Sequence, residues 1–250
     1  MFPGTEIIVL SVTAATIAFV HTVLGPDHYV PFIAMARARK WTLARTMTIT
    51  LYCGVGHLLG SVVLGLIGIA IGTQLASLQW LEALRGTLAA WLLIGFGLAY
   101  LAWGLRQAWR NKPHTHWHRH DDVFHIHEHK HQSDHAHVHI EHDLATESSA
   151  HRVSLTPWVI FIIFVLGPCE PLIPLLMYPA ARESMLGVMM VTGVFGLVTV
   201  LTMCSVVLIS TLGLQRLKRP ERLAGLERFA HAAAGGTIML CGMSIVFLGL

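Results

Sequence analysis

Charged residues are scarce in this 250-residue chain: Asp, Glu, Lys and Arg together make up 12% of it, whereas hydrophobic residues make up 54%. That balance excludes an ordinary soluble domain, in which about a quarter of the residues are charged. The apolar residues occur in runs of about 20, the length that crosses a bilayer as a helix. The sequence therefore predicts an integral membrane protein.

Cysteine is also rare. The four cysteines, which all fall inside apolar runs, are Cys53, Cys169, Cys204 and Cys241. Without paired spacing or an oxidising aqueous compartment, a disulfide framework is not expected. The chain has no phosphate-binding loop of the kind that ATP-driven pumps need, and nothing in it indicates an enzyme or a prosthetic group. The first apolar run lacks the basic flank and cleavage pattern of a signal peptide, so we expect it to remain as a helix.

Six apolar runs are long enough to span a membrane, which predicts an all-α, polytopic fold. They cover residues 5–24, 46–72, 86–105, 157–177, 186–212 and 230–250. We expect residues 1–106 to form a first three-helix repeat, 107–153 a cytoplasmic loop and 154–250 a second three-helix repeat. Leucines at helical spacing over residues 75–84 predict a short helix along the membrane interface.

The phrase Val-Leu-Gly-Pro occurs twice, at residues 23–26 and 165–168, inside the first and fourth predicted spans. A Gly-Pro pair interrupts a helix because proline lacks a backbone donor and disfavours helical geometry in the residue before it. With three spans in each half, the second copy enters the membrane from the opposite side. The sequence therefore predicts six transmembrane helices as a 3+3 inverted repeat, with helices one and four broken.

Lys and Arg are concentrated after the first, third and fifth predicted spans, whereas the opposite connections hold only Arg85 and Arg182. The positive-inside rule then places both termini outside and the central loop in the cytoplasm, in a bacterial-type inner membrane. The net charge of +3 follows from this anchoring bias, so no nucleic-acid partner is expected. The sequence is compatible with a homo-oligomer.

The central loop carries most of the histidines and has no hydrophobic period, which predicts a disordered segment. Clustered imidazoles bind borderline metals such as Ni, Co, Zn and Cu, so we expect auxiliary metal binding here. These residues are His114, His116, His118, His120, His125, His127, His129, His131, His135, His137, His139 and His142.

Few polar residues lie within the predicted spans, and burying one without a partner costs several kcal/mol. The candidates for a metal site are His21, Asp27, His28, His57, Cys169 and Glu170. Imidazole, carboxylate and thiol groups together suit a first-row divalent cation, and no Lys or Arg is predicted inside a span to hold an anion. On a continuous helix His21 and His28 would lie about 10 Å apart, so a shared ion requires the Gly-Pro break.

These residues resemble the nickel/cobalt transporter and efflux superfamily, within the wider LysE-like transporters. The likeness is carried by His21 with Asp27-His28, Gly56-His57, the Gly167-Pro168-Cys169 turn and the histidine-rich loop. The permeases of this group have a His-x4-Asp-His signature in an early helix, whereas the spacing here is one residue longer. The long loop is more similar to the efflux branch. Relatives of urease-accessory and sulfite-exporter type share the general layout.

The resemblance implies a secondary transporter of Ni²⁺ or Co²⁺, with Zn²⁺ a further candidate substrate, and export is favoured over uptake. Asp27 and His28 would bind the ion directly, and His57, Cys169 and Glu170 would close the site. Two other functions stay open. Half-helix dipoles would favour an exporter of a small anion such as sulfite, and Cys169 beside a second cysteine such as Cys53 would favour a transmembrane thiol-redox conductor.

Overall fold

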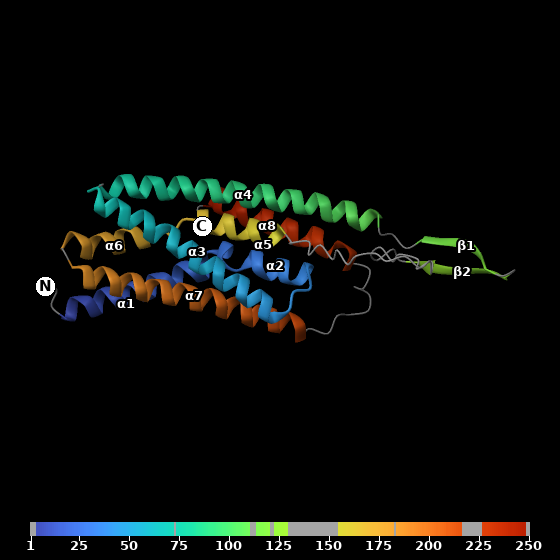
Figure 1. Cartoon of the computed structure of the whole chain (residues 1–250), viewed down its shortest axis with the longest axis horizontal. Helices are drawn as coiled ribbons and strands as arrows, with labels where there is room; N and C mark the ends of the chain where they lie inside the picture. Colours follow the sequence, from blue (N-terminus) through green and yellow to red (C-terminus); the bar gives the residue numbers. More distant parts are fainter. Residues whose placement is uncertain are drawn as a thin grey trace, which may run out of the picture.

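A computed structural model describes residues 4–72, 74–110, 114–120, 123–129, 155–182, 184–216 and 227–248. The elements in chain order are α1 (Gly4–Leu24), the 3-10 turn η1 (Pro26–His28), α2 (Val30–Ala38), α3 (Leu43–Ala70), α4 (Leu75–Arg110), β1 (His114–His120), β2 (Val123–His129), α5 (Leu155–Leu166), α6 (Leu172–Ala181), α7 (Met185–Arg216) and α8 (Ala230–Leu248). The helices form an elongated bundle, and the two strands lie beyond one end of it (Figure 1).

Five helices are long and apolar enough to cross a membrane. They cover Thr5–Leu24, Leu43–Ala70, Leu75–Arg110, Met185–Arg216 and Glu227–Leu248. Many of their large apolar side chains point away from the bundle: Ile8, Leu59 and Ile209 are 64%, 52% and 70% exposed. A surface of this kind suits lipid, and backbone groups paired within helices are what a bilayer requires. The prediction of a helical membrane-spanning protein is therefore confirmed.

The fourth predicted span is not one continuous helix. Residues 157–177 are divided between α5 and α6, each of which is shorter than a membrane span. Within the described residues, five long helices and the two short helices α5 and α6 therefore take the place of six similar spans, and the short helix α2 follows the first break. The 3+3 inverted repeat stays a prediction.

Both Gly-Pro pairs end a helix, as predicted. α1 ends at Leu24, where the Gly25 N–H donates to the His21 carbonyl at 2.9 Å, and the turn η1 follows before α2. α5 ends at Leu166, and Pro171 is the N-cap of α6. Because a proline nitrogen cannot donate, the hydrogen-bond ladder of each helix cannot run through the pair. Each half of the chain thus holds one break.

The prediction of a separate interfacial helix over residues 75–84 is wrong. Those residues form the start of α4, which continues to Arg110 without a break. Leu78 and Glu82 are buried, at 2% and 0% exposure, and the Leu78 side chain packs against Gly68 of α3. The polar residues near this segment indicate a water interface from sequence, but in the structure Glu82 and the adjacent Arg85 have partners inside the bundle.

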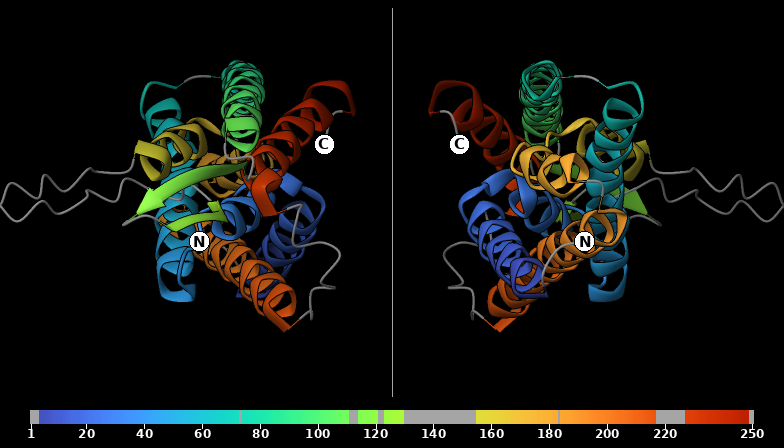
Figure 2. Two further views of the ribbon diagram at one scale, coloured as in Figure 1. Left: turned by 90° about the vertical axis from the view of Figure 1, so that its right-hand side faces the viewer. Right: turned by 90° about the vertical axis from the view of Figure 1, so that its left-hand side faces the viewer.

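Two pairs of long helices enclose the short central ones. α4 packs along α8, and α1 packs along α7 (Figure 2). The α4–α8 approach is close because small residues meet: a Cβ on Gly97 would lie 2.4 Å from the Met239 backbone nitrogen, and one on Gly235 would lie 2.3 Å from that of Leu101. α5 packs against both α3 and α4. This contact brings the second break against two of the long helices.

Part of the histidine-rich loop, which we predicted to lack regular structure, forms an antiparallel hairpin. β1 pairs with β2 so that His114 lies opposite His129 and His118 opposite His125. The His-x-His alternation has the two-residue period of a strand, which accounts for the difference. The predicted loop ligands His131, His135, His137, His139 and His142 lie outside the described residues, as do the side chains of the hairpin.

Candidate metal centre

The first break brings two histidines of one segment together. His21 lies in the last turn of α1, and the turn η1 carries His28 back toward it. Their ring centroids are 4.9 Å apart and the rings are nearly perpendicular. A continuous helix would separate the two residues by about 10 Å along its axis, so the break is what makes them neighbours.

His28 is held in one orientation by its own turn. Its Nδ1 lies 3.1 Å from the Gly25 carbonyl oxygen and 3.1 Å from Oδ1 of Asp27. Both neighbours accept hydrogen bonds, so we assign the proton to Nδ1, which leaves Nε2 to face the interior. The ring is 2% exposed. Asp27 thus contacts the imidazole of His28 and orients it.

His57 comes from α3 and shows the same arrangement at the second break. Its Nδ1 lies 3.2 Å from the carbonyl oxygen of Phe164, in the last turn of α5, which also accepts from the Gly167 N–H at 3.0 Å. The ring is 2% exposed, and its centroid is 5.1 Å from that of His28. A hydrogen bond from one ring nitrogen to a carbonyl or carboxylate is the usual way that proteins orient a metal-binding histidine.

One ring nitrogen of each of the three histidines is left without a partner. Nε2 of His21, His28 and His57 is buried in each case and has no hydrogen-bond partner within the described part of the chain. A buried polar atom left in this state costs free energy unless something binds it. The three unpartnered nitrogens belong to neighbouring rings, since the centroid of the His28 ring lies 4.9 Å from that of His21 and 5.1 Å from that of His57.

Cys169 of the second break completes the cluster. One ligand atom each from His21, His57 and Cys169 lies within 4.8 Å of the others. In a tetrahedral site with bonds of about 2.0–2.3 Å, neighbouring ligand atoms lie roughly 3.3–3.7 Å apart. A contraction of at most about 1.5 Å would therefore close the group around a single ion. The thiol is fully buried, with 0% exposure for the residue.

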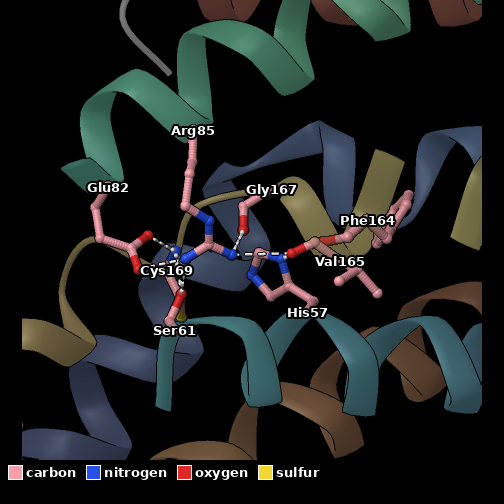
Figure 3. A network of polar contacts seen from close by, with 8 residues as sticks. All are labelled: His57, Ser61, Glu82, Arg85, Phe164, Val165, Gly167 and Cys169. Atoms are coloured by element: carbon pink, nitrogen blue, oxygen red, sulfur yellow. Dashed lines mark hydrogen bonds and ion pairs between the residues drawn. The ribbon is translucent and has the colours of Figure 1, made fainter. Parts of the chain in front are cut away.

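A buried network supports the second break (Figure 3). The Cys169 N–H donates to Oγ of Ser61 and to Oε2 of Glu82, each at 3.2 Å. Arg85 forms an ion pair with Glu82 at 2.6 Å and donates to the carbonyl oxygens of Val165 at 2.9 Å and Gly167 at 3.4 Å. Arg85 lies within α4, so the prediction that no Lys or Arg falls inside a span is wrong.

The sequence reasoning missed this network although a signal was present. Glu82 and Arg85 are opposite charges three residues apart on an apolar helix, which is a spacing at which side chains meet. Intramembrane ionisable residues are functional candidates by default. In the sequence Arg85 stands just before the predicted span over residues 86–105, a position that is typical of a connection between spans.

A cavity of about 710 Å³ opens beside the cluster. Its lining includes His21, His28 and His57 and the two acidic residues Asp27 and Glu170, and none of its lining residues in the described part of the chain is Lys or Arg. Small residues of α4 and the end of α8 form much of the rest. Glu170 is exposed and belongs to the wall of the cavity, outside the group of converging ligand atoms. The electrostatic character of the cavity suits a cation.

The predicted site residues therefore divide into three groups. His21, His57 and Cys169 share one cluster, and His28 adjoins both of its histidines. Asp27 lines the cavity and contacts His28, whereas Glu170 lines the cavity and lies outside the cluster.

Comparisons with protein-family models, curated proteins and solved structures gave no match for this chain.

Proposed function

We propose that this protein is a secondary transporter of a divalent first-row transition-metal ion, with Ni²⁺ or Co²⁺ as substrate. The observation that carries the proposal is the cluster of His21, His57 and Cys169, which adjoins His28 and lies next to a cavity. Nε2 of each of these histidines is buried and unpartnered within the described part of the chain. Imidazole and thiolate ligands favour metals of this class and disfavour Mg²⁺ and Ca²⁺, which prefer oxygen. The resemblance noted in the sequence favours Ni²⁺ or Co²⁺ among them.

The ligands would be Nε2 of His21, His28 and His57 and the thiolate of Cys169. Asp27 would orient His28 from behind, and Glu170 would attract the ion into the cavity. Charge supports this assignment, since a divalent ion, the thiolate and the Asp27 carboxylate sum to zero. Glu82 and Arg85 neutralise each other. A neutral site is the arrangement that a low-dielectric membrane interior tolerates best.

An anion is a poorer substrate for this cavity. Arg85 contacts the second break, and its guanidinium is occupied by Glu82 and two backbone carbonyls. The cavity itself is lined by acidic and imidazole groups. A sulfite-type anion would therefore meet two carboxylates and no free positive side chain among the described lining residues.

A thiol-redox conductor is also less well supported. All four cysteines are free. Cys53 packs in a buried cluster with Phe32 and Met203, whereas Cys169 belongs to a different cluster with Phe195. Electron transfer through disulfide exchange needs a thiol within reach of another, and Cys169 and Cys53, the pair that such a conductor would use, pack in different clusters.

Transport would proceed by alternating access around the two breaks, which the predicted inverted repeat would present from opposite sides of the bilayer. We propose an inner-membrane location with both termini outside. The histidine-rich loop would collect metal in the cytoplasm, which favours export. Without an ATP-binding loop in the sequence, the ion gradient of the membrane would supply the energy.

Metal accumulation in cells tests the proposal. Cells with and without the protein would be loaded with radiolabelled Ni²⁺, Co²⁺ and Zn²⁺, and an exporter would lower the steady-state content of its substrate. His57→Ala should abolish the difference, whereas Cys204→Ser, at a cysteine of α7 outside the cluster, should retain it. Equal contents of every metal in both strains would disprove metal transport.

A further inference from the structure

The second break is held by residues of two other helices. The Arg85 guanidinium donates to the carbonyls of Val165 and Gly167, at the end of α5. The Glu82 carboxylate accepts the Cys169 N–H. Ser61 of α3 accepts from both sides, at 3.2 Å from the Cys169 nitrogen and 3.4 Å from Nη1 of Arg85. Figure 3 shows these side chains meeting around the turn.

The charges of this pair match the polarity of the interrupted helix. The carbonyl end of a helix carries partial negative charge, and free N–H groups carry partial positive charge. Arg85 faces the carbonyls and Glu82 faces the N–H, so each side chain stabilises the backbone groups of opposite polarity. The fit is close: a Cβ on Gly60 would lie 2.6 Å from the guanidinium, and one on Gly86 would lie 2.7 Å from Pro168.

The first break is held differently. Its side-chain hydrogen bonds within the described residues stay inside the same segment: His28 contacts Gly25 and Asp27, and Tyr29 donates to the Val23 carbonyl. The second break is therefore fixed to α3 and α4, while the first is supported by its own turn. The two copies of the Val-Leu-Gly-Pro phrase are therefore held by different sets of contacts.

An ion pair buried to this degree is not needed for stability alone. Glu82 is 0% exposed, and apolar residues of similar volume often replace such a pair without loss of stability. What an apolar replacement cannot do is hold the backbone of Cys169 in one place. The pair thus has a role in geometry, and the group whose geometry it sets is the thiol beside the histidines.

We infer that Glu82 and Arg85 are positioning residues that hold the Cys169 thiol as a metal ligand and thereby set the preference for a thiolate-binding metal. This inference rests on the proposed function. Without the pair, the histidines would still bind a metal ion, with water in place of sulfur. The pair therefore separates metals that favour thiolate from those that accept a nitrogen and oxygen site.

Cobalt spectroscopy of the purified full-length protein tests this. Co²⁺ bound to a thiolate gives a near-ultraviolet charge-transfer band, and the histidine-rich loop cannot contribute because it contains no cysteine. The wild type should show the band, and Cys169→Ser should abolish it. Glu82→Leu combined with Arg85→Met removes both charges together and should also abolish it, with about a 10- to 100-fold loss of affinity at the cluster.

Matched controls and a second variant keep the outcomes separate. Glu6→Gln and Arg216→Gln alter exposed residues of the same types and should leave the band unchanged. If the double variant does not fold, Ser61→Ala, which removes one acceptor of the Cys169 N–H, should weaken the band. A band of wild-type intensity in either folded variant overturns the inference alone. A wild type without any cobalt band overturns the proposed metal site as well.

Discussion

His21 and His28 are seven residues apart in the chain, yet their imidazole rings lie 4.9 Å apart. The Gly25-Pro26 break produces this approach, since it ends α1 and turns the chain before α2 begins. The ring centroid of His57, from α3, lies 5.1 Å from that of His28. The break thus serves the site by shortening a distance along one segment, in addition to freeing backbone groups.

Gly25 should tolerate no side chain. A Cβ at this position would lie 2.6 Å from Nδ1 of His28 and 2.9 Å from Oδ1 of Asp27. Gly25→Ala should therefore push His28 out of the cluster and lower metal affinity by about 10-fold or more, measured by titration of the cobalt band. Gly193→Ala on α7, where a Cβ would meet nothing within 4 Å, is the control and should bind normally.

Asp27 should be required for transport although it is not one of the converging ligands. Asp27→Ala removes the acceptor of the His28 Nδ1–H and a charge that balances the ion, so we expect a 10- to 100-fold loss of flux. The measurement is Ni²⁺ or Co²⁺ flux in proteoliposomes. Unchanged flux would show that His28 does not depend on this carboxylate and would remove it from the site.

At the α4–α8 contact, an added side chain at Gly97 should lower stability, whereas one at Gly95 should not. A Cβ on Gly97 would lie 2.4 Å from the backbone nitrogen of Met239, whereas one on Gly95 would meet nothing within 4 Å. Gly97→Ala should lower the free energy of unfolding by about 1–3 kcal/mol, the usual cost of overpacking. Gly95→Ala should be neutral or slightly stabilising. Thermal unfolding in detergent compares the two, and equal melting temperatures would contradict the close contact.

Arg39 should stabilise the bundle through its contacts with two other helices. Its Nε donates to the Tyr100 hydroxyl at 3.1 Å and its Nη2 to Oγ1 of Thr156 at 2.7 Å, which joins α2 to α4 and α5. Hydrogen bonds to charged groups contribute about 1.5–3 kcal/mol each when well made, less where the group is partly exposed, as here. Arg39→Ala should lower the melting temperature, and Arg37→Ala, at an exposed arginine of the same helix, should not.

The helical membrane-spanning architecture, the two breaks and the site histidines could be predicted from the sequence because each depends on local composition. Apolar runs, Gly-Pro pairs and rare polar residues within them are visible along the chain. Contacts between distant segments are not. Arg85 and Val165 are far apart in sequence but hydrogen bonded, and nothing in the local pattern of α4 indicates which backbone carbonyls it will meet.

The role of Asp27 shows the same limit on a smaller scale. The sequence predicted Asp27 and His28 as equivalent ligands because both follow the Gly-Pro pair. In the structure the Asp27 carboxylate lies against Nδ1 of His28. It therefore contacts the imidazole ring, and it is not a second, equivalent member of the cluster. Residue type predicted that a metal-binding group would lie here, but the conformation of η1 decided which atom faces the cluster.

Anomalous diffraction from crystals of the Co²⁺-loaded protein tests the central claim most directly, because it locates the metal independently of the loop. The account predicts a cobalt peak about 2.0–2.3 Å from Nε2 of His21, His28 and His57 and from Sγ of Cys169. Cobalt found only on the histidine-rich loop, with no peak among these four side chains at saturating metal, would contradict it.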